Sequence, residues 1–378
     1  MERYDAIVIG VGGVGSAALA HLATRGAKVL GIERFESPNK QGSTHGQTRL
    51  IRMAYYEHPD YVPLLQRAYQ LWGGLEQESG RTLYQGCGIL QVSPGDGSVY
   101  PGVLASAAQH QLQVETLSEE EVRRRFPGFR IEEPLRAVFE PGAGYLMVED
   151  CVTSYVEQAK RAGGTLLNGE SVREWRAVGG GVEVVTDQNR YSAKNLIVTA
   201  GSWANDFLRD LGGRLEVVRK SLYWYEAEED VYRPESGGVG FIYETSRGNF
   251  YGFPQIDGNG VKVAEHTGGH PVANPLLVNR DEDPAETARV LDFLSRYLPG
   301  VSPRKKAFAT CLYTLSPDRR FIVDRHPEFP QVSFAAGLSG HGYKFASVLG
   351  EVLADWATQG RTELPVGFLS LGRPGLCG

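Results

Sequence analysis

The chain opens with two short, unbroken apolar runs, residues 6–9 and 29–32. Unbroken runs of this length, rich in Val and Ile, are typical of strands buried in a parallel sheet. The Ala- and Leu-rich segment between them, residues 14–25, predicts a helix that ends at Gly26. Helical spacing of apolar residues recurs over three further segments, residues 60–78, 149–162 and 345–356.

A glycine motif joins the first strand to the first helix. Gly10, Gly12 and Gly15 have the spacing G-x-G-x-x-G, and Glu33 ends the second strand. In such a unit the glycines allow a tight turn, a close approach of backbone to a pyrophosphate, and close helix–strand packing. Phosphates bind at the helix N-terminus, and the acid accepts the ribose hydroxyls. The motif therefore predicts a dinucleotide site but does not separate NAD from FAD.

The pattern changes in the second half of the chain. Residues 217–309 hold short alternating runs rich in Tyr, Trp, Phe and Val, joined by turns such as "SRGN" and "DGNG", which predict an antiparallel sheet. We expect an α/β fold in which a Rossmann-like nucleotide-binding domain is joined to an α+β substrate domain. The nucleotide-binding domain is expected to comprise residues 1–85, 146–216 and 307–378, and the substrate domain residues 86–145 and 217–306.

Composition narrows the functional classes. A formal net charge of −6 over 378 residues does not favour a nucleic-acid partner, which selects a basic surface. The 4 cysteines have no CxxC spacing, so no metal site or redox pair is predicted, and Cys87 and Cys377 have no assignable role. The first residues do not resemble a secretory signal, and no apolar run reaches the roughly 18 residues of a membrane helix. We expect a cytoplasmic protein with no membrane contact.

Basic residues gather after the glycine unit, in "GSTHGQTRLIRMAY" at residues 42–55. Arg49 and Arg52 would share one face if this segment ended in a helix. A solvated basic turn is the simpler interpretation. Beside a dinucleotide site, however, guanidinium groups are natural clamps for a carboxylate.

Two lysines also stand out. In the predicted strand over residues 261–266, alternation places Lys262 and His266 on one face. That face is either solvent-exposed or directed into a cavity that the sheet covers. Lys344 follows the glycine loop "GLSGHGYK" at the start of a helix, where a cation opposes the helix dipole. Such a local conflict often marks a functional position.

Together these segments resemble the monomeric sarcosine oxidase and N-methyltryptophan oxidase family, within the D-amino acid oxidase group. The resemblance covers nearly the whole chain and is most specific in "GSTHGQTRLIR", in "CLYTLSPDRRFIVD" and in "GLSGHGYKFAS". That family commonly has a second histidine where this chain has Thr44.

The resemblance assigns Cys311 an unusual role. It implies that this cysteine carries FAD covalently, through a thioether to the 8α-methyl group of the flavin. A thiolate nucleophile and an electrophilic carbon suit that reaction. Three basic residues upstream, at positions 304–306, are expected to favour the thiolate. Without the motif around it, Cys311 would be taken as a buried apolar residue.

The resemblance also implies the remaining site residues. The substrate carboxylate would bind Arg52 and Lys344, and Tyr251 would contact the substrate. The catalytic group would comprise Lys262, Arg49, His266 and Tyr313. The residues expected to bind the cofactor are Gly10, Gly12, Gly15, Glu33, Ser43, His45, Thr48, Val172, Cys311, Gly340, Gly342 and Lys344.

The predicted function is that of an FAD-dependent amine oxidase. It would oxidise the C–N bond of sarcosine or a similar secondary amino acid, with oxygen as acceptor and hydrogen peroxide as product, and without a metal. We expect a monomer. Open alternatives are a flavin oxidase of N-methyltryptophan, proline or pipecolate, a non-covalent amino acid oxidase or dehydrogenase, a nicotinamide dehydrogenase, and a flavoprotein without catalytic activity.

Overall fold

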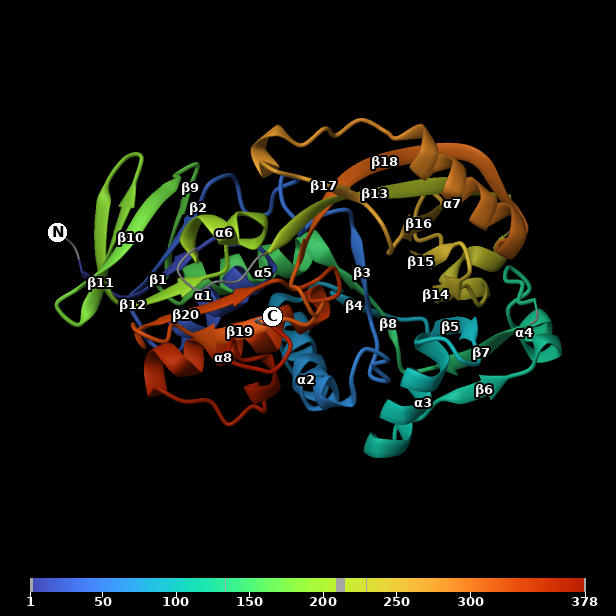
Figure 1. Ribbon diagram of the computed structural model, residues 1–378, viewed down its shortest axis with the longest axis horizontal. Helices are drawn as coiled ribbons and strands as arrows, with labels where there is room; N and C mark the ends of the chain where they lie inside the picture. The colour runs from blue at the N-terminus through green and yellow to red at the C-terminus, as the bar shows by residue number, and fades with distance from the viewer. Residues whose placement is uncertain (1–2, 133, 209–214, 229, 377–378) are drawn as a thin grey trace.

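The computed structural model describes residues 3–132, 134–208, 215–228 and 230–376. Cys377 lies outside them. Two large sheets, each with its own layer of helices, lie side by side along the long axis of the molecule (Figure 1). The α/β fold class predicted from the sequence is confirmed.

The first large sheet has eight strands in the order β10-β11-β12-β1-β2-β9, with β20 paired to β12 and β19 to β20. Its centre is parallel, because β1 (Arg3–Ile9) pairs in parallel with both β2 (Val29–Glu33) and β12 (Arg190–Val198). The predicted strand–helix–strand unit is thus the core of this sheet. The carboxyl ends of β1 and β2 meet at one edge, beside the N-terminus of α1 (Gly13–Thr24).

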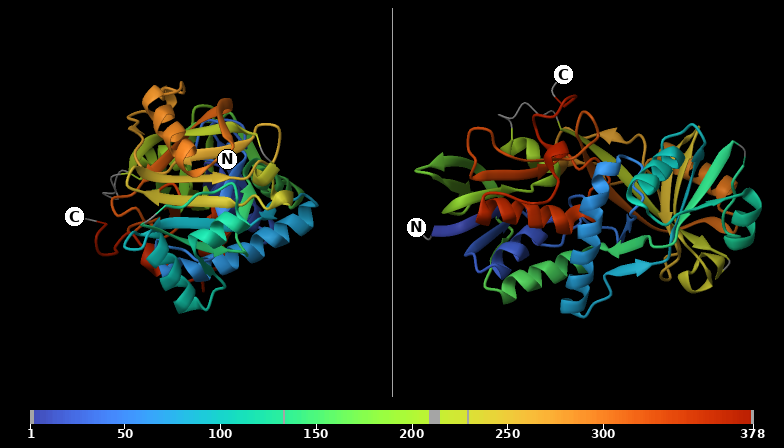
Figure 2. Two further views of the ribbon diagram at one scale, coloured as in Figure 1. Left: turned by 90° about the vertical axis from the view of Figure 1, so that its right-hand side faces the viewer. Right: turned by 90° about the horizontal axis from the view of Figure 1, so that it is seen from below.

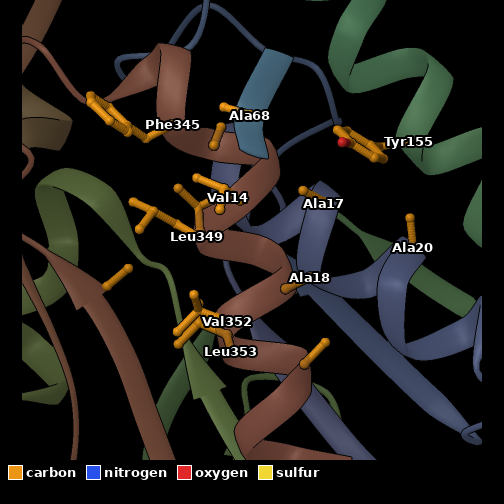
Figure 3. Close-up of a cluster of buried hydrophobic side chains, with 14 of the residues drawn as sticks. Val14, Ala17, Ala18, Ala20, Ala68, Tyr155, Phe345, Leu349, Val352 and Leu353 are labelled. Carbon is orange, nitrogen blue, oxygen red and sulfur yellow. The ribbon is translucent and has the colours of Figure 1, made fainter. Parts of the chain in front are cut away.

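A hydrophobic cluster joins four helices to this sheet. The cluster contains side chains of α1, α2 (Val62–Ser79), α5 (Val148–Arg161) and α8 (Ala346–Gln359). Figure 3 shows Val14 and Ala17 of α1 packed against Leu349 and Val352 of α8. These are helices that apolar spacing predicted, and all four predictions are confirmed. A predicted helical end to residues 42–55 is wrong, because Thr48–Ile51 forms strand β3.

The second large sheet has nine strands in the order β17-β13-β16-β15-β14-β5-β7-β6, with β18 paired to β13. The pair β13 (Glu216–Ala227) and β18 (Val301–Leu315) extends from the first sheet to the far end of the molecule. A small three-stranded sheet, β3-β8-β4, completes the fold. Helix α2 runs between the two large sheets (Figure 2, right).

We propose a domain division that follows the two large sheets. It keeps the segments expected from the sequence, except that residues 307–315 belong with the second sheet, because β18 pairs with β13 along its length.

The other strands are β4 Tyr84–Gly86, β5 Ile89–Pro94, β6 Glu115–Leu117, β7 Leu135–Glu140, β8 Gly144–Met147, β9 Thr165–Asn168, β10 Val172–Val178, β11 Gly181–Thr186, β14 Gly240–Thr245, β15 Gly248–Phe253, β16 Val261–Glu265, β17 His270–Pro271, β19 Ile322–Arg325 and β20 Val332–Ala336. The other α-helices are α3 Val99–His110, α4 Glu119–Arg125, α6 Ala204–Phe207 and α7 Pro284–Tyr297. Within the described ranges, no helix has the length and apolar character needed to cross a membrane. The same residues hold no group of three His, Cys, Asp or Glu side chains that could bind a metal ion.

The contact between α1 and α8 depends on a glycine. A Cβ atom on Gly350 would lie 2.5 Å from the Cβ of Ala17 and 2.7 Å from the backbone nitrogen of Ala18. We expect Gly350→Ala to destabilise the protein by about 1–3 kcal/mol, because the helices would have to move apart. Gly73→Ala is the matched control, since nothing lies within 4 Å of its added Cβ.

The control substitution should stabilise by about 0.5–1 kcal/mol, because Ala is the better helix former. Urea unfolding of both variants, followed by circular dichroism, measures the two effects. An equal effect of the two substitutions would show that the α1–α8 contact tolerates the added methyl group.

Candidate active site

A cavity lies where β1 and β2 end and α1 begins. Its walls include residues of the glycine turn, the end of β2, the 42–44 loop and the loop between β20 and α8. Helix α1 has no side-chain cap and no acidic residue in its first turn. The positive end of its dipole is therefore available to a pyrophosphate.

The nucleotide end of this cavity fits an adenosine ribose. Glu33 is buried, and its carboxylate accepts hydrogen bonds from the backbone N–H groups of Val11 (2.8 Å) and Phe35 (3.1 Å). Burial raises the pKa of this carboxyl, although the two N–H groups oppose the shift. Carboxylate oxygens have lone pairs for further donors. Gly15 serves packing, because a Cβ there would lie 1.9 Å from the carbonyl oxygen of Gly10.

The other end of the cavity is formed by Arg49, Tyr313 and Gly340. The Arg49 guanidinium donates hydrogen bonds to the carbonyl oxygens of Thr48 (2.8 Å) and Ser43 (2.9 Å). Gly340 has a φ of +81°, and a Cβ there would lie 2.3 Å from the Tyr313 ring. Only glycine fits this position, where the loop, the ring and the cavity meet.

Cys311 is buried beside this end of the cavity. Its Sγ lies 3.4 Å from the Arg49 guanidinium and 3.6 Å from the Ser43 carbonyl oxygen. The expectation that the basic residues at 304–306 support the thiolate is wrong, because those side chains pair with Glu226 and Glu282. Arg49 is the cation beside the sulfur, and the fold brings it there from a distant part of the chain.

A second cavity adjoins the first at Arg49, Gly340 and Tyr343, which line both. Its other walls come from the segment after β3, from β14 and β15, and from the loop before α8. Its lining includes Arg52, Tyr56, Glu57, Ile242, Asn249, Tyr251, His266, His341 and Lys344.

Arg52 forms the most tightly bound ion pair of this cavity. Its guanidinium donates two hydrogen bonds to the Glu57 carboxylate, at 2.9 and 2.8 Å, and stacks over the rings of Tyr55 and Tyr56, each 4.4 Å away. Although burial opposes the shift, Arg52 with His341 and Lys344 lowers the pKa of Glu57 to about 2. Glu57 is therefore an ionised carboxylate. It pairs with Arg52, the cation that the family resemblance assigned to the substrate carboxylate.

Lys344 lies next to this pair. Its ammonium donates to the His341 carbonyl oxygen (2.7 Å) and lies 5.2 Å from the centre of the Tyr55 ring. Burial, together with the nearby Arg52, lowers its pKa to about 7. It lies in a short 3-10 turn, Tyr343–Phe345, just before α8, so the predicted place at a helix start is confirmed.

Three ring side chains form one wall where the two cavities adjoin: Tyr313 lines the first cavity, and Tyr251 and His266 line the second. The Tyr251 and Tyr313 hydroxyls lie 3.3 Å apart, and Tyr313 contacts Nδ1 of His266 at 3.4 Å. Burial lowers the pKa of His266 to about 3, so this imidazole is neutral at physiological pH. The wall is polar at its tips but carries no charge.

Lys262 lies on the same sheet as this wall but lines neither cavity. Its side chain is 2% exposed, so the solvent-facing alternative is wrong. The ammonium donates to the carbonyl oxygens of Gly46 and Thr48 and to the Thr48 hydroxyl, and lies 5.3 Å from the Trp224 ring. Burial, with the nearby Arg49, lowers its pKa well below the usual lysine value.

The remaining predicted residues are distributed around these groups. Ser43, Val172 and Gly342 line the first cavity. His45 lines a separate cavity near Arg280, and its buried Nε2 has no hydrogen-bond partner among the described residues.

The sequence analysis did not identify Glu57 and Tyr56 as residues that line the second cavity. Both residues follow closely after Arg52 in "RMAYYEH", and this proximity was the available indication of a contact. It was weak, because most carboxylates near an arginine in the sequence do not pair with it.

The chain matches known flavoproteins over its whole length. The family model described as "FAD dependent oxidoreductase" matches residues 5–356. A monomeric sarcosine oxidase of Streptomyces avermitilis is 40% identical over 97% of this chain and 96% of its own. An N-methyl-L-tryptophan oxidase of Yersinia pestis is 37% identical over 98% of this chain and 99% of its own.

A solved structure gives the same result. NikD, described as an unusual amino acid oxidase essential for nikkomycin biosynthesis, superposes with a TM-score of 0.86 at 26% identity, covering 98% of each chain. The cavity chemistry, the family model and the relatives agree. This chain belongs to the family of FAD-dependent oxidoreductases, and within it the chain is similar to the monomeric sarcosine and N-methyl-L-tryptophan oxidases.

Proposed function

We propose that this protein is an FAD-dependent oxidase of small secondary amino acids, with sarcosine or a similar N-methyl amino acid as substrate. The observation that carries the proposal is the cation-rich second cavity, which meets the cofactor cavity at Arg49, Gly340 and Tyr343. Bound FAD supplies the chemistry of accepting a hydride equivalent from the carbon next to the amine nitrogen.

Arg52 and Lys344 hold the substrate carboxylate in this proposal. Glu57 pairs with Arg52 through one nitrogen of the guanidinium, so the incoming carboxylate binds at the other donors of that group and at the Lys344 ammonium. Glu57 keeps its partner in this arrangement, which avoids leaving an unpaired buried charge. An amine that lacks a carboxylate gains nothing from these two cations, so the site selects carboxylated amines.

The same cations favour the reactive form of the amine. A secondary amine must lose its proton before its carbon can give up a hydride equivalent, and nearby positive charge lowers its pKa. Tyr251, Tyr313 and the neutral His266 orient the amine without adding a charge. With sarcosine the products are glycine and formaldehyde, after hydrolysis of the imine.

Lys262 and Arg49 serve the reaction with oxygen in this proposal. A fixed buried cation stabilises negative charge that develops on oxygen as electrons reach it. Hydrogen peroxide is then the second product. We further propose that the protein acts as a monomer in the cytoplasm.

The similarity to N-methyl-L-tryptophan oxidase favours one alternative. The substrate is then a bulkier secondary amino acid, such as N-methyltryptophan, proline or pipecolate, bound through the same carboxylate site.

We also propose a covalent bond between Cys311 and the 8α carbon of the flavin. The thiol lies next to Arg49, a cavity residue, and sulfur is a nucleophile suited to an electrophilic carbon. Cys311 would hold the cofactor through a C–S bond that replaces the S–H bond and one methyl C–H bond. The redox chemistry that FAD and oxygen supply would accept the two electrons released.

Anaerobic stopped flow with sarcosine tests the function. The yellow protein should bleach, and air should restore the colour with one peroxide formed per turnover.

Lys262→Met should slow reoxidation about 10²-fold, because a preorganised cation is lost, while slowing reduction far less. Lys194→Met, which removes an exposed lysine paired with Asp5, is the control. Equal slowing of both half-reactions would remove Lys262 from the oxygen site.

Acid precipitation tests the covalent bond. Yellow colour should stay with the pellet of the wild-type protein and pass to the supernatant with Cys311→Ser. Cys87→Ser is the matched control, because Cys87 lies in the cluster beneath β5 and away from both cavities. Release of the colour from the wild-type protein would contradict covalent attachment and leave the oxidase proposal standing.

The carboxylate site has a pH signature. Because the Lys344 pKa is about 7, the ammonium loses its proton above that pH, whereas a bound carboxylate keeps it protonated. Binding then takes up a proton, so the Kd of propionate should rise about tenfold per pH unit above pH 7. Titration of the flavin absorbance measures it. Lys344→Met should bind more weakly and without this slope, and a flat wild-type profile would exclude Lys344 from the anion site.

A further inference from the structure

Strands β14 and β15 present one face to the second cavity. Ile242 pairs with Tyr251, and Glu244 with Asn249, between β14 and β15. The ring of Phe250 stacks on Phe293 at 4.3 Å, on the opposite side of the sheet. Since side chains alternate along a strand, Asn249 and Tyr251 both point to the cavity side, and both line that cavity.

Asn249 has an uncommitted amide on this face. Its backbone is in use, because its N–H donates to the Thr267 hydroxyl (3.0 Å) and its carbonyl oxygen accepts from the His266 N–H (2.6 Å). Its side-chain amide makes no hydrogen bond to any residue in the described part of the chain. A carboxamide offers two donors and one acceptor oxygen.

The neighbours of Asn249 across the sheet have their polar groups engaged elsewhere. The Glu244 carboxylate accepts hydrogen bonds from the N–H groups of Ser98 (2.8 Å) and Val99 (2.9 Å) at the start of α3. His266 contacts the Tyr313 hydroxyl and is neutral at physiological pH. The amide is therefore an uncharged polar group on the cavity wall that no described residue engages.

The position of this amide bears on the substrate side chain. Arg52 and Lys344 line the same cavity, so a substrate held there by its carboxylate presents its other groups to the remaining walls. Those walls include the apolar Leu50 and Ile242 and the polar Asn249. Sarcosine has no side chain that could reach the amide.

We propose that Asn249 forms a second, polar subsite that selects N-methyl amino acids with a hydroxyl or carboxamide in the side chain. This inference rests on the proposed oxidase function and specifies its substrate class. An uncharged amide pairs with an uncharged hydrogen-bonding group without the desolvation penalty of an ion. An apolar side chain of the same shape leaves the amide unsatisfied on closure of the site.

Two isosteric substrate pairs test the subsite. N-methyl-L-serine is compared with N-methyl-L-2-aminobutyrate, and N-methyl-L-asparagine with N-methyl-L-leucine, by kcat/KM from peroxide release. The wild-type enzyme should favour the polar member of at least one pair about fivefold, the value of one neutral hydrogen bond. Asn249→Leu should bring that ratio to one or below, because it keeps the volume and removes the amide.

Two controls make the result decisive. Asn168→Leu, on β9 at the edge of the first sheet, should keep the wild-type ratio. Asn249→Ala gives the same readout if the leucine variant does not fold. A wild-type ratio of one or less in both pairs, or a preference that survives in the Asn249 variants, overturns the subsite. If the subsite fails in either way and sarcosine is still oxidised, the oxidase proposal stands. If no secondary amino acid is oxidised, the subsite and the oxidase function are both overturned.

Discussion

The buried guanidinium of Arg49 is the interaction on which the site depends. It lies where the two cavities meet, and its hydrogen bonds reach the Ser43 carbonyl oxygen and the Cys311 sulfur as well as the neighbouring Thr48. No carboxylate of the described residues lies within ion-pair distance of it. A buried cation held only by neutral and sulfur acceptors is costly, and the proposed function gives that cost a reason.

Most other buried charges of the site are also positive. Arg52, Lys262 and Lys344 are buried cations around the two cavities, and Glu57 is the carboxylate paired directly with one of them. Burial lowers the pKa of both lysines, so the pocket resists further positive charge. This one property favours an anionic carboxylate, a deprotonated amine and the reduction of oxygen. The three steps of the proposed reaction therefore share a single electrostatic cause.

The sheet beside the second cavity separates polar side chains from the core. Lys262, Tyr251, His266 and Asn249 lie on one face of β15, β16 and the residue that follows β16, and all but Lys262 line the second cavity. Because side chains alternate along a strand, a change at one of these positions leaves the hydrophobic face undisturbed. The opposite face, with Phe250 and Phe293, packs independently as core.

By itself, the sequence determined the strand–helix–strand unit, the core helices and the alternating strands of the second sheet, because those signals depend on neighbouring residues. It also drew attention to Arg52, Lys262 and Lys344, although only Lys344 conflicts with its local surroundings. The tertiary structure alone decided the partners of these charges. Residues 304–306 lie close to Cys311 in the sequence, yet their charges pair with Glu226 and Glu282, and the cation beside the sulfur is Arg49. Likewise, only folding places Glu57 on Arg52 and leaves the Asn249 amide without a hydrogen bond to any described residue, since the partners of a charge or an amide are the groups within a few ångströms of it in space.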